Sequence, residues 1–177
     1  MNLKKLAIVV ATLTLFSVPT QAGSFGAYGS YWSSDEADNS WGGGARVGFN
    51  FAKWMELEFH ATYYPDFGTN VFTQDVELKA IPVDGGLKFN FLPDKMVNPY
   101  AGLGVTYYFL DSNQGSIDNE TGFYGEAGLD FGNEDVRFFV EAMWRKLDTS
   151  ISVDTFTQDV AFDGIDWNAG VVWRWGK

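Results

Sequence analysis

The sequence of 177 residues predicts an all-β fold: an eight-stranded antiparallel up-and-down transmembrane β-barrel. Three observations predict this fold: a two-strand unit that recurs four times, long stretches in which apolar and polar residues alternate, and a composition rich in glycine and aromatic residues (20 glycines; 18% Phe, Trp and Tyr). Mean hydropathy is only −0.12. A membrane barrel has such a value because the polar residues that face its lumen dilute the apolar residues that face lipid.

The N-terminal residues 1–22 have the charge and hydropathy order of a secretory signal peptide. Lys4 and Lys5 precede an apolar run that ends at Val18, and Ala22 is the small residue before the expected cleavage site. The run is shorter than the roughly 20 residues that a membrane-spanning helix needs. We therefore expect export, with residues 23–177 as a single outer-membrane barrel domain.

The composition of the exported domain narrows the possible partners. The formal net charge of −11 becomes more negative once the two signal-peptide lysines are removed, so the chain would repel phosphates and no nucleic-acid partner is expected.

The sequence contains no cysteine, which means that an exported fold of this size forms without disulfides. A closed barrel does not need them.

The repeat is the pattern glycine, apolar residue, any residue, aromatic residue. Copies begin at Gly48, Gly86, Gly128 and Gly170 and end at Phe51, Phe89, Phe131 and Trp173. Each copy closes an alternating stretch, and the copies are about 40 residues apart, which is the length of a hairpin unit. Four units of two strands give eight strands.

The individual strands follow from alternation with a period of two. The first, at about 23–33, has no clear apolar face. The others are expected at 41–51, 55–63, 76–89, 101–109, 123–131, 136–144 and 165–175. Within 76–89 the apolar positions change from even to odd at Ile81-Pro82, and this change predicts a β-bulge there.

The polar face of these strands distinguishes a membrane barrel from a soluble, lipocalin-like binder, in which the apolar face would point inward. Acids and bases on this face could nearly neutralise one another as a lumen charge network, and glycines accompany them where a narrow barrel has little room. The network is predicted to contain Arg46, Glu56, Glu58, His60, Lys88, Glu126, Asp130, Arg137, Glu141, Arg145, Asp166 and Arg174. Such an interior also disfavours a wide pore, which takes about 16 strands.

The apolar face carries large aromatic residues near the strand ends, as the interfacial girdles of a membrane barrel require. We expect the girdle to include Trp41, Trp54, Tyr63, Trp144, Trp167, Trp173 and Trp175. Both faces together favour insertion in a membrane.

The stretch Asn98–Val105, in which Pro-Tyr opens a strand with alternating glycines, resembles the central strand of OmpW-like and OmpA-like outer-membrane barrels. The resemblance implies a Gram-negative outer membrane, both termini in the periplasm, short periplasmic turns and long outer loops. It also implies contact with outer-membrane lipid and lipopolysaccharide, insertion by the barrel-assembly machinery, and a monomer. The chain departs from the family at its C-terminus, where Gly176 and Lys177 follow the last aromatic residue, Trp175.

Few residues suggest chemistry, and no cofactor is expected. The single histidine, His60, falls on the polar face, where a hydrogen-bonded lumenal role is favoured over a catalytic one. The expected outer segments 33–40, 65–75, 111–121 and 148–163 contain many acids and no Lys or Arg. Solvated acidic loops are the favoured interpretation; the alternative is Ca²⁺ or Mg²⁺ held at Asp35, Glu36, Asp38, Asp154 and Asp159.

The predicted function is that of a non-enzymatic outer-membrane barrel with a structural, adhesive or narrow-channel role. An alternative is a lateral conduit for small hydrophobic compounds, which would require an opening in the wall, for which Ile81-Pro82 is the candidate. A lipid-modifying enzyme would require a polar cluster on the lipid-facing surface, and the alternating stretches contain none.

Overall fold

The computed structural model describes residues 22–34, 39–71, 74–112, 120–146, 148–153, 156–161 and 164–176. The predicted signal peptide lies outside this set except for Ala22, whose carbonyl oxygen accepts a hydrogen bond from the Asn50 amide. Within the described part of the chain, no helix is long and apolar enough to cross a membrane.

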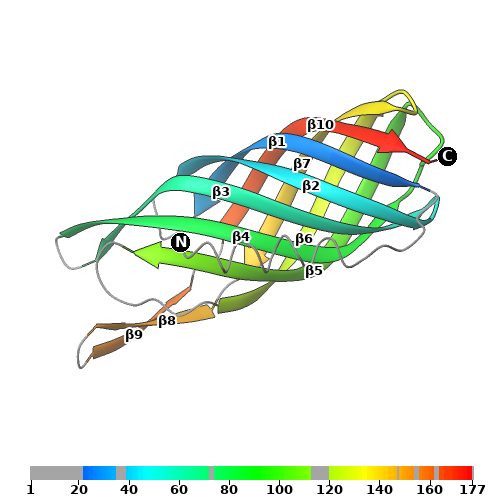
Figure 1. Ribbon diagram of the computed structural model, residues 1–177. Coiled ribbons are helices and arrows are strands. Elements are labelled where there is room, and N and C mark those ends of the chain that lie inside the picture. Colours follow the sequence, from blue (N-terminus) through cyan, green and yellow to red (C-terminus); the bar gives the residue numbers. More distant parts are fainter. Residues whose placement is uncertain are drawn as a thin grey trace.

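Eight antiparallel strands close into a barrel, as the sequence predicts (Figure 1). They are β1 (Gly23–Ser34), β2 (Ser40–Ala52), β3 (Met55–Val71), β4 (Gln74–Asn90), β5 (Val97–Ser112), β6 (Glu120–Gly132), β7 (Val136–Lys146) and β10 (Gly164–Trp175). Neighbours in the chain are neighbours in the barrel, and β1 pairs with β10 to close it. Between β7 and β10, the strands β8 (Asp148–Val153) and β9 (Phe156–Ala161) form a separate two-stranded sheet.

The two ends of the barrel differ. At one end, called the turn end, the short connections 53–54, 91–96 and 133–135 lie together with the end of β10 (Figure 1). The β8–β9 hairpin lies at the opposite end, called the hairpin end. Two of the expected outer segments, 65–75 and 148–163, contain paired strands. In the first, β3 and β4 continue into the hairpin end and pair as far as Val71 and Gln74. The second contains β8 and β9.

The acidic residues singled out as candidate cation ligands belong to this hairpin end. Asp35, Glu36, Asp38 and Asp154 lie outside the described residues. The backbone of Asp159 is described, and it pairs with Ser150 in the β8–β9 sheet.

Alternation along the strands divides the side chains between the lumen and the outer wall. In β7, Arg137, Phe139 and Glu141 are buried while Phe138 and Val140 are exposed. All predicted girdle residues face outward, with exposed fractions from 45% for Trp173 to 73% for Trp41. A wall of exposed Leu, Val, Phe and Trp around a polar interior is the arrangement of a membrane barrel and the inverse of a soluble one.

The bulge predicted at Ile81-Pro82 is wrong. Ala80, Pro82 and Asp84 are all buried, so β4 keeps one parity through this stretch, and its register with β5 is unbroken. The change of apolar parity misled the prediction because Ala80 is small enough to face the lumen.

The irregularity lies on the neighbouring strand. Between β3 and β4 the register shifts between Tyr64 and Phe67, so that β3 carries one extra residue, next to Pro65. The paired positions on β4 also skip from Val83 to Ala80. Pro82 has no amide hydrogen to donate, which explains why the β3–β4 ladder is interrupted beside it while the β4–β5 ladder is not.

Lumen-facing glycines make room for large side chains on adjacent strands. A Cβ atom on Gly128 would lie 2.5 Å from a Tyr100 ring carbon, and one on Gly44 would lie 2.5 Å from Cζ of Tyr28. The glycine of each sequence repeat is therefore a packing position, over which a neighbouring strand lays a tyrosine or a carboxylate. An eight-stranded barrel is just wide enough to be filled in this way.

Candidate functional site: the lumen

The structure brings the predicted charge network together inside the barrel. Every member is buried except Arg174, which is 18% exposed and lies near the turn end. Asp84, also buried, joins the network. The charged side chains fall into three groups along the barrel axis, because strand register aligns residues of the same height on different strands.

The group nearest the hairpin end is centred on Arg145. Its Nη2 lies 2.6 Å from Asp84 Oδ2, and its Nη1 forms an ion pair with Asp166. Both acids have further partners: the Thr106 hydroxyl donates to Asp84 (2.7 Å) and the Tyr64 hydroxyl donates to Asp166 (2.8 Å). One cation thus holds two buried carboxylates, each satisfied by a neutral donor as well.

The middle group is centred on Arg46. Its guanidinium pairs with Glu58 and lies 3.4 Å from Glu141 Oε2, and its carbon Cζ lies 4.3 Å from the centre of the Phe139 ring. Glu141 also accepts hydrogen bonds from the Tyr100 hydroxyl (2.8 Å) and from Asn168 (3.0 Å). The aromatic ring and the carboxylates together enclose the cation.

The group at the turn end contains Lys88 and Asp130. The Lys88 ammonium lies 3.7 Å from Asp130 Oδ2 and 3.8 Å from Glu56 Oε2, and Arg174 donates to Asp130 at 3.1 Å. The Ser24 hydroxyl donates to the second oxygen of Glu56 (2.6 Å). Lys88 therefore bridges two acids that come from different sides of the barrel.

Arg137 behaves differently from the other predicted network members. Its Nη2 donates to the backbone carbonyls of Lys95 (2.8 Å) and Pro93 (3.2 Å) in the β4–β5 turn, and among the described residues it has no carboxylate within ion-pair distance. It closes the turn end by holding this connection. Sequence parity placed it on the correct face but could not reveal its partner.

His60 lies in the lumen as expected, and its polar contact with a described side chain is a long one, to Glu58. Its Nε2 is 3.4 Å from Glu58 Oε2, and neither ring nitrogen has a hydrogen-bond partner among the described residues. Across the lumen, Glu126 approaches from β6, and its Oε2 is likewise without a partner in the described part of the chain. One ligand atom from each of Glu58, His60 and Glu126 lies within 4.8 Å of the others.

The lumen also has an aromatic component that was not predicted from the sequence. Tyrosines, a tryptophan and a phenylalanine fill the space between the charged groups: Tyr28, Trp32, Tyr64, Tyr100, Tyr108, Tyr124 and Phe139 are all buried. The sequence predicted aromatic residues only for the outer girdle, whereas the strand parity of these seven matches that of the charged lumen residues. Parity alone would have identified Tyr100, which precedes Ala101 on a clearly alternating strand.

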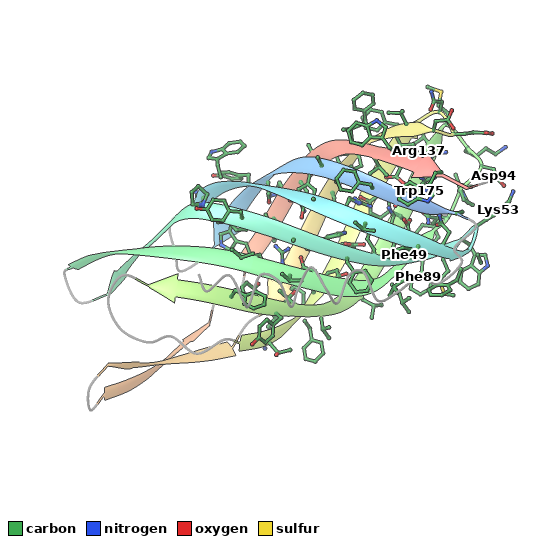
Figure 2. All side chains as sticks on the ribbon, viewed as in Figure 1. Phe49, Lys53, Phe89, Asp94, Arg137 and Trp175 are labelled. Atoms are coloured by element: carbon green, nitrogen blue, oxygen red, sulfur yellow. The ribbon has the colours of Figure 1, made fainter. Side chains whose placement is uncertain are left out.

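A pocket of about 600 Å³ lies at the turn end. Its lining includes Lys53, Asp94, Arg137, Arg174 and Trp175, several of which are labelled in Figure 2. Lys53 and Asp94 form an exposed ion pair (3.1 Å) between two of the short connections. Further along the barrel axis from this pocket, the three charged groups and the aromatic side chains occupy the barrel interior.

Comparisons with known proteins agree with this architecture. The model of the outer membrane protein beta-barrel domain matches residues 8–174. Among solved structures, the outer membrane protein OprG from Pseudomonas aeruginosa has a TM-score of 0.71 at 16% identity, over 88% of this chain and 96% of that one. No curated protein sequence matches the chain.

Two further barrels have the same fold. Neisserial surface protein A has a TM-score of 0.62 at 12% identity, over 88% of this chain and 96% of its own. The N-terminal barrel domain of Pseudomonas aeruginosa OprF has a TM-score of 0.57 at 13% identity, over 88% and 98%. Taken with the match to the family model along nearly the whole sequence, they lead to one conclusion: the chain belongs to the outer membrane protein beta-barrel domain family and resides in a Gram-negative outer membrane.

Proposed function

We propose that this protein is a closed, non-enzymatic barrel that serves a structural or adhesive role at the cell surface. The observation that carries the proposal is the filled lumen, in which Arg145, Arg46 and Lys88 each bridge buried carboxylates at successive heights. A solute crossing the barrel would have to separate these ion pairs, and leaving a buried charge without its partner costs several kcal/mol. The filled interior thus supports an anchor more than a channel.

The separate hairpin at one end of the barrel supports the adhesive part of the proposal. The β8–β9 sheet is separate from the barrel sheet, so its contacts with a partner would not disturb the wall (Figure 1). The family resemblance orients this end outward. On this proposal the barrel acts as a monomer in contact with lipid and lipopolysaccharide after insertion by the barrel-assembly machinery.

Recording in planar lipid bilayers tests the closed lumen. The purified barrel should give no discrete conductance steps under conditions in which a general porin, added to the same bilayer as a positive control, gives large ones. Reproducible steps from the folded protein would contradict the proposal and favour the narrow-channel role.

Deletion of residues 148–161 tests the adhesive role. Because this segment is a separate sheet, the shortened protein should still fold, which the mobility shift between unboiled and boiled samples on a gel reports. Adhesion of cells to a surface should fall when the full-length and shortened proteins are present at equal surface levels. Unchanged adhesion would leave only the structural role.

The second candidate function, a lateral conduit for small hydrophobic compounds, is favoured by the interrupted β3–β4 ladder. The missing donor of Pro82 and the extra residue of β3 weaken the same seam of the wall. Ile81-Pro82, the candidate opening predicted from the sequence, lies on β4 at this seam.

A disulfide across this seam tests the conduit. The chain has no native cysteine, so Ala61→Cys with Val83→Cys introduces a single bridge beside the interruption, and Ala27→Cys with Ala45→Cys places a matched one in the regular β1–β2 pairing. If the seam opens, the first pair should slow uptake of the hydrophobic dye N-phenylnaphthylamine and dithiothreitol should restore it. Equal uptake by both oxidised variants would exclude the conduit.

A further inference from the structure

Three buried side chains, each with a polar atom that has no hydrogen-bond partner among the described residues, converge near the middle of the barrel. Glu58 and His60 project from β3, and Glu126 projects from β6. The strands β4 and β5 lie between them in the barrel wall. Their exposed fractions are 1%, 2% and 6%, so none is solvated. A ligand atom from each lies within 4.8 Å of the others.

Several polar atoms of this cluster lack a hydrogen-bond partner in the described part of the chain. Both nitrogens of His60 and Oε2 of Glu126 have no hydrogen-bond partner among the described residues. Glu58 divides its two oxygens: Oε1 faces the cations Arg46 and Lys88, whereas Oε2 faces His60. Buried polar atoms are nearly always satisfied, so these nitrogen and oxygen atoms are available as ligands for an ion.

The net charge of the lumen also favours a bound cation. The described lumen contains seven carboxylates and five basic side chains, an excess of two negative charges when His60 is neutral. The acids are Glu56, Glu58, Asp84, Glu126, Asp130, Glu141 and Asp166, and the bases are Arg46, Lys88, Arg137, Arg145 and Arg174. Among these residues Glu126 is the carboxylate without an ion-pair partner. Uncompensated charge is costly in a buried interior.

We propose that Glu58 Oε2, His60 and Glu126 form a binding site for one divalent transition-metal ion, of which Zn²⁺ best suits the ligands. One imidazole nitrogen with two carboxylates is a donor set that Zn²⁺ uses and that Ca²⁺ and Mg²⁺, which prefer oxygen alone, do not. A charge of +2 would also neutralise the excess in the lumen. This site is separate from the acidic outer segments and does not depend on the proposed surface role.

The geometry allows the site to close around an ion. Ligand atoms around a tetrahedral Zn²⁺ lie about 3.4 Å apart, given bonds of about 2.1 Å. The ligand atoms now lie within 4.8 Å of one another, so they would approach by up to about 1.4 Å on binding, while Arg46 pairs with the other oxygen of Glu58. Gly102 provides the space for Glu126, since a Cβ atom at this position would lie 2.8 Å from Glu126 Cγ.

The test is the metal content of the complete folded barrel. Protein refolded in detergent with Zn²⁺ or Co²⁺, then dialysed, should retain about one ion per chain by elemental analysis. The Co²⁺ form should show visible d–d absorption of a site with nitrogen and oxygen ligands. Retained metal should fall at least tenfold in His60→Gln and in Glu126→Gln.

Two further variants separate loss of the site from loss of the fold. Gly102→Ala keeps all three ligands but crowds Glu126, so it should weaken retention, whereas Asp94→Asn removes an exposed carboxylate at the turn end and should leave retention unchanged. Folding of each variant is verified by the heat-dependent gel shift, and Zn²⁺ should raise the melting temperature of the parent protein but not of His60→Gln. A folded parent that retains neither ion, or retention that persists in His60→Gln and Glu126→Gln, would overturn the proposal.

Discussion

Replacing Arg145 with methionine should destabilise the barrel more than any other single loss of charge in the group nearest the hairpin end. Arg145 is 1% exposed and pairs with Asp84 and Asp166, which are equally buried. Methionine fills much of the same volume but leaves two carboxylates without their cation. Removing one partner of a buried pair costs about 3–5 kcal/mol of the free energy of unfolding. Because two acids lose their cation here, we expect a loss near the upper limit, at about 4–5 kcal/mol.

The measurement is urea-dependent unfolding in lipid vesicles, followed by the fluorescence of the seven tryptophans. Lys53→Met is the matched control, because it removes a cation from an exposed ion pair (side chains 78% and 70% exposed) and should cost no more than about 1 kcal/mol. Combining Arg145→Met with Asp84→Asn and Asp166→Asn should recover part of the loss, since the amides are neutral.

The result that refutes this reasoning is a loss below about 1 kcal/mol in Arg145→Met with an unchanged urea dependence. Such a result would mean that water reaches the two carboxylates in the folded barrel. The lumen would then be hydrated, and the closed-barrel proposal would fail with it.

Further predictions concern packing and orientation. Gly128→Ala should destabilise the barrel by about 1–3 kcal/mol in the same unfolding assay because its methyl group would collide with Tyr100, whereas Gly29→Ala, with no atom within 4 Å of the added carbon, should be neutral. Leu103→Arg, at a wall position that is 63% exposed, should cost about 2–4 kcal/mol in a bilayer, while a soluble barrel would tolerate it; equal stability of this variant and the parent would argue against a lipid-facing wall. Arg137→Met should loosen the β4–β5 turn, seen as faster amide hydrogen exchange at Lys95 relative to Gly125 on the distant wall, because two carbonyls lose their donor.

The sequence predicted the wall well and the interior less completely. Alternation assigned residues such as Trp41 and Trp144 to the outer face and Arg46 and Glu141 to the lumen, because a strand with period two has only two choices for each side chain. The wall of a barrel is a local property of each strand, so it can be predicted without knowing which strands are neighbours.

The interior depends on register and on contacts across the lumen, which the sequence does not encode locally. Glu126 meets His60 only because β6 and β3 present them at the same height on different sides of the barrel. The site of the bulge was missed for a related reason: Ala80 fits either face, and the extra residue lies on the partner strand, between Tyr64 and Phe67. Hydrophobicity alone cannot distinguish a small wall residue from a small lumen residue.

The interleaving of lumen and wall residues also has a consequence for how the protein reaches its membrane. A chain destined for the outer membrane must first pass through the inner one, where an apolar stretch of about 20 residues would be retained as a helix. In β7, buried Arg137, Glu141 and Arg145 interrupt the lipid-facing residues at short intervals. The charges that β7 contributes to the finished barrel therefore also allow this strand to be translocated while it is still unfolded.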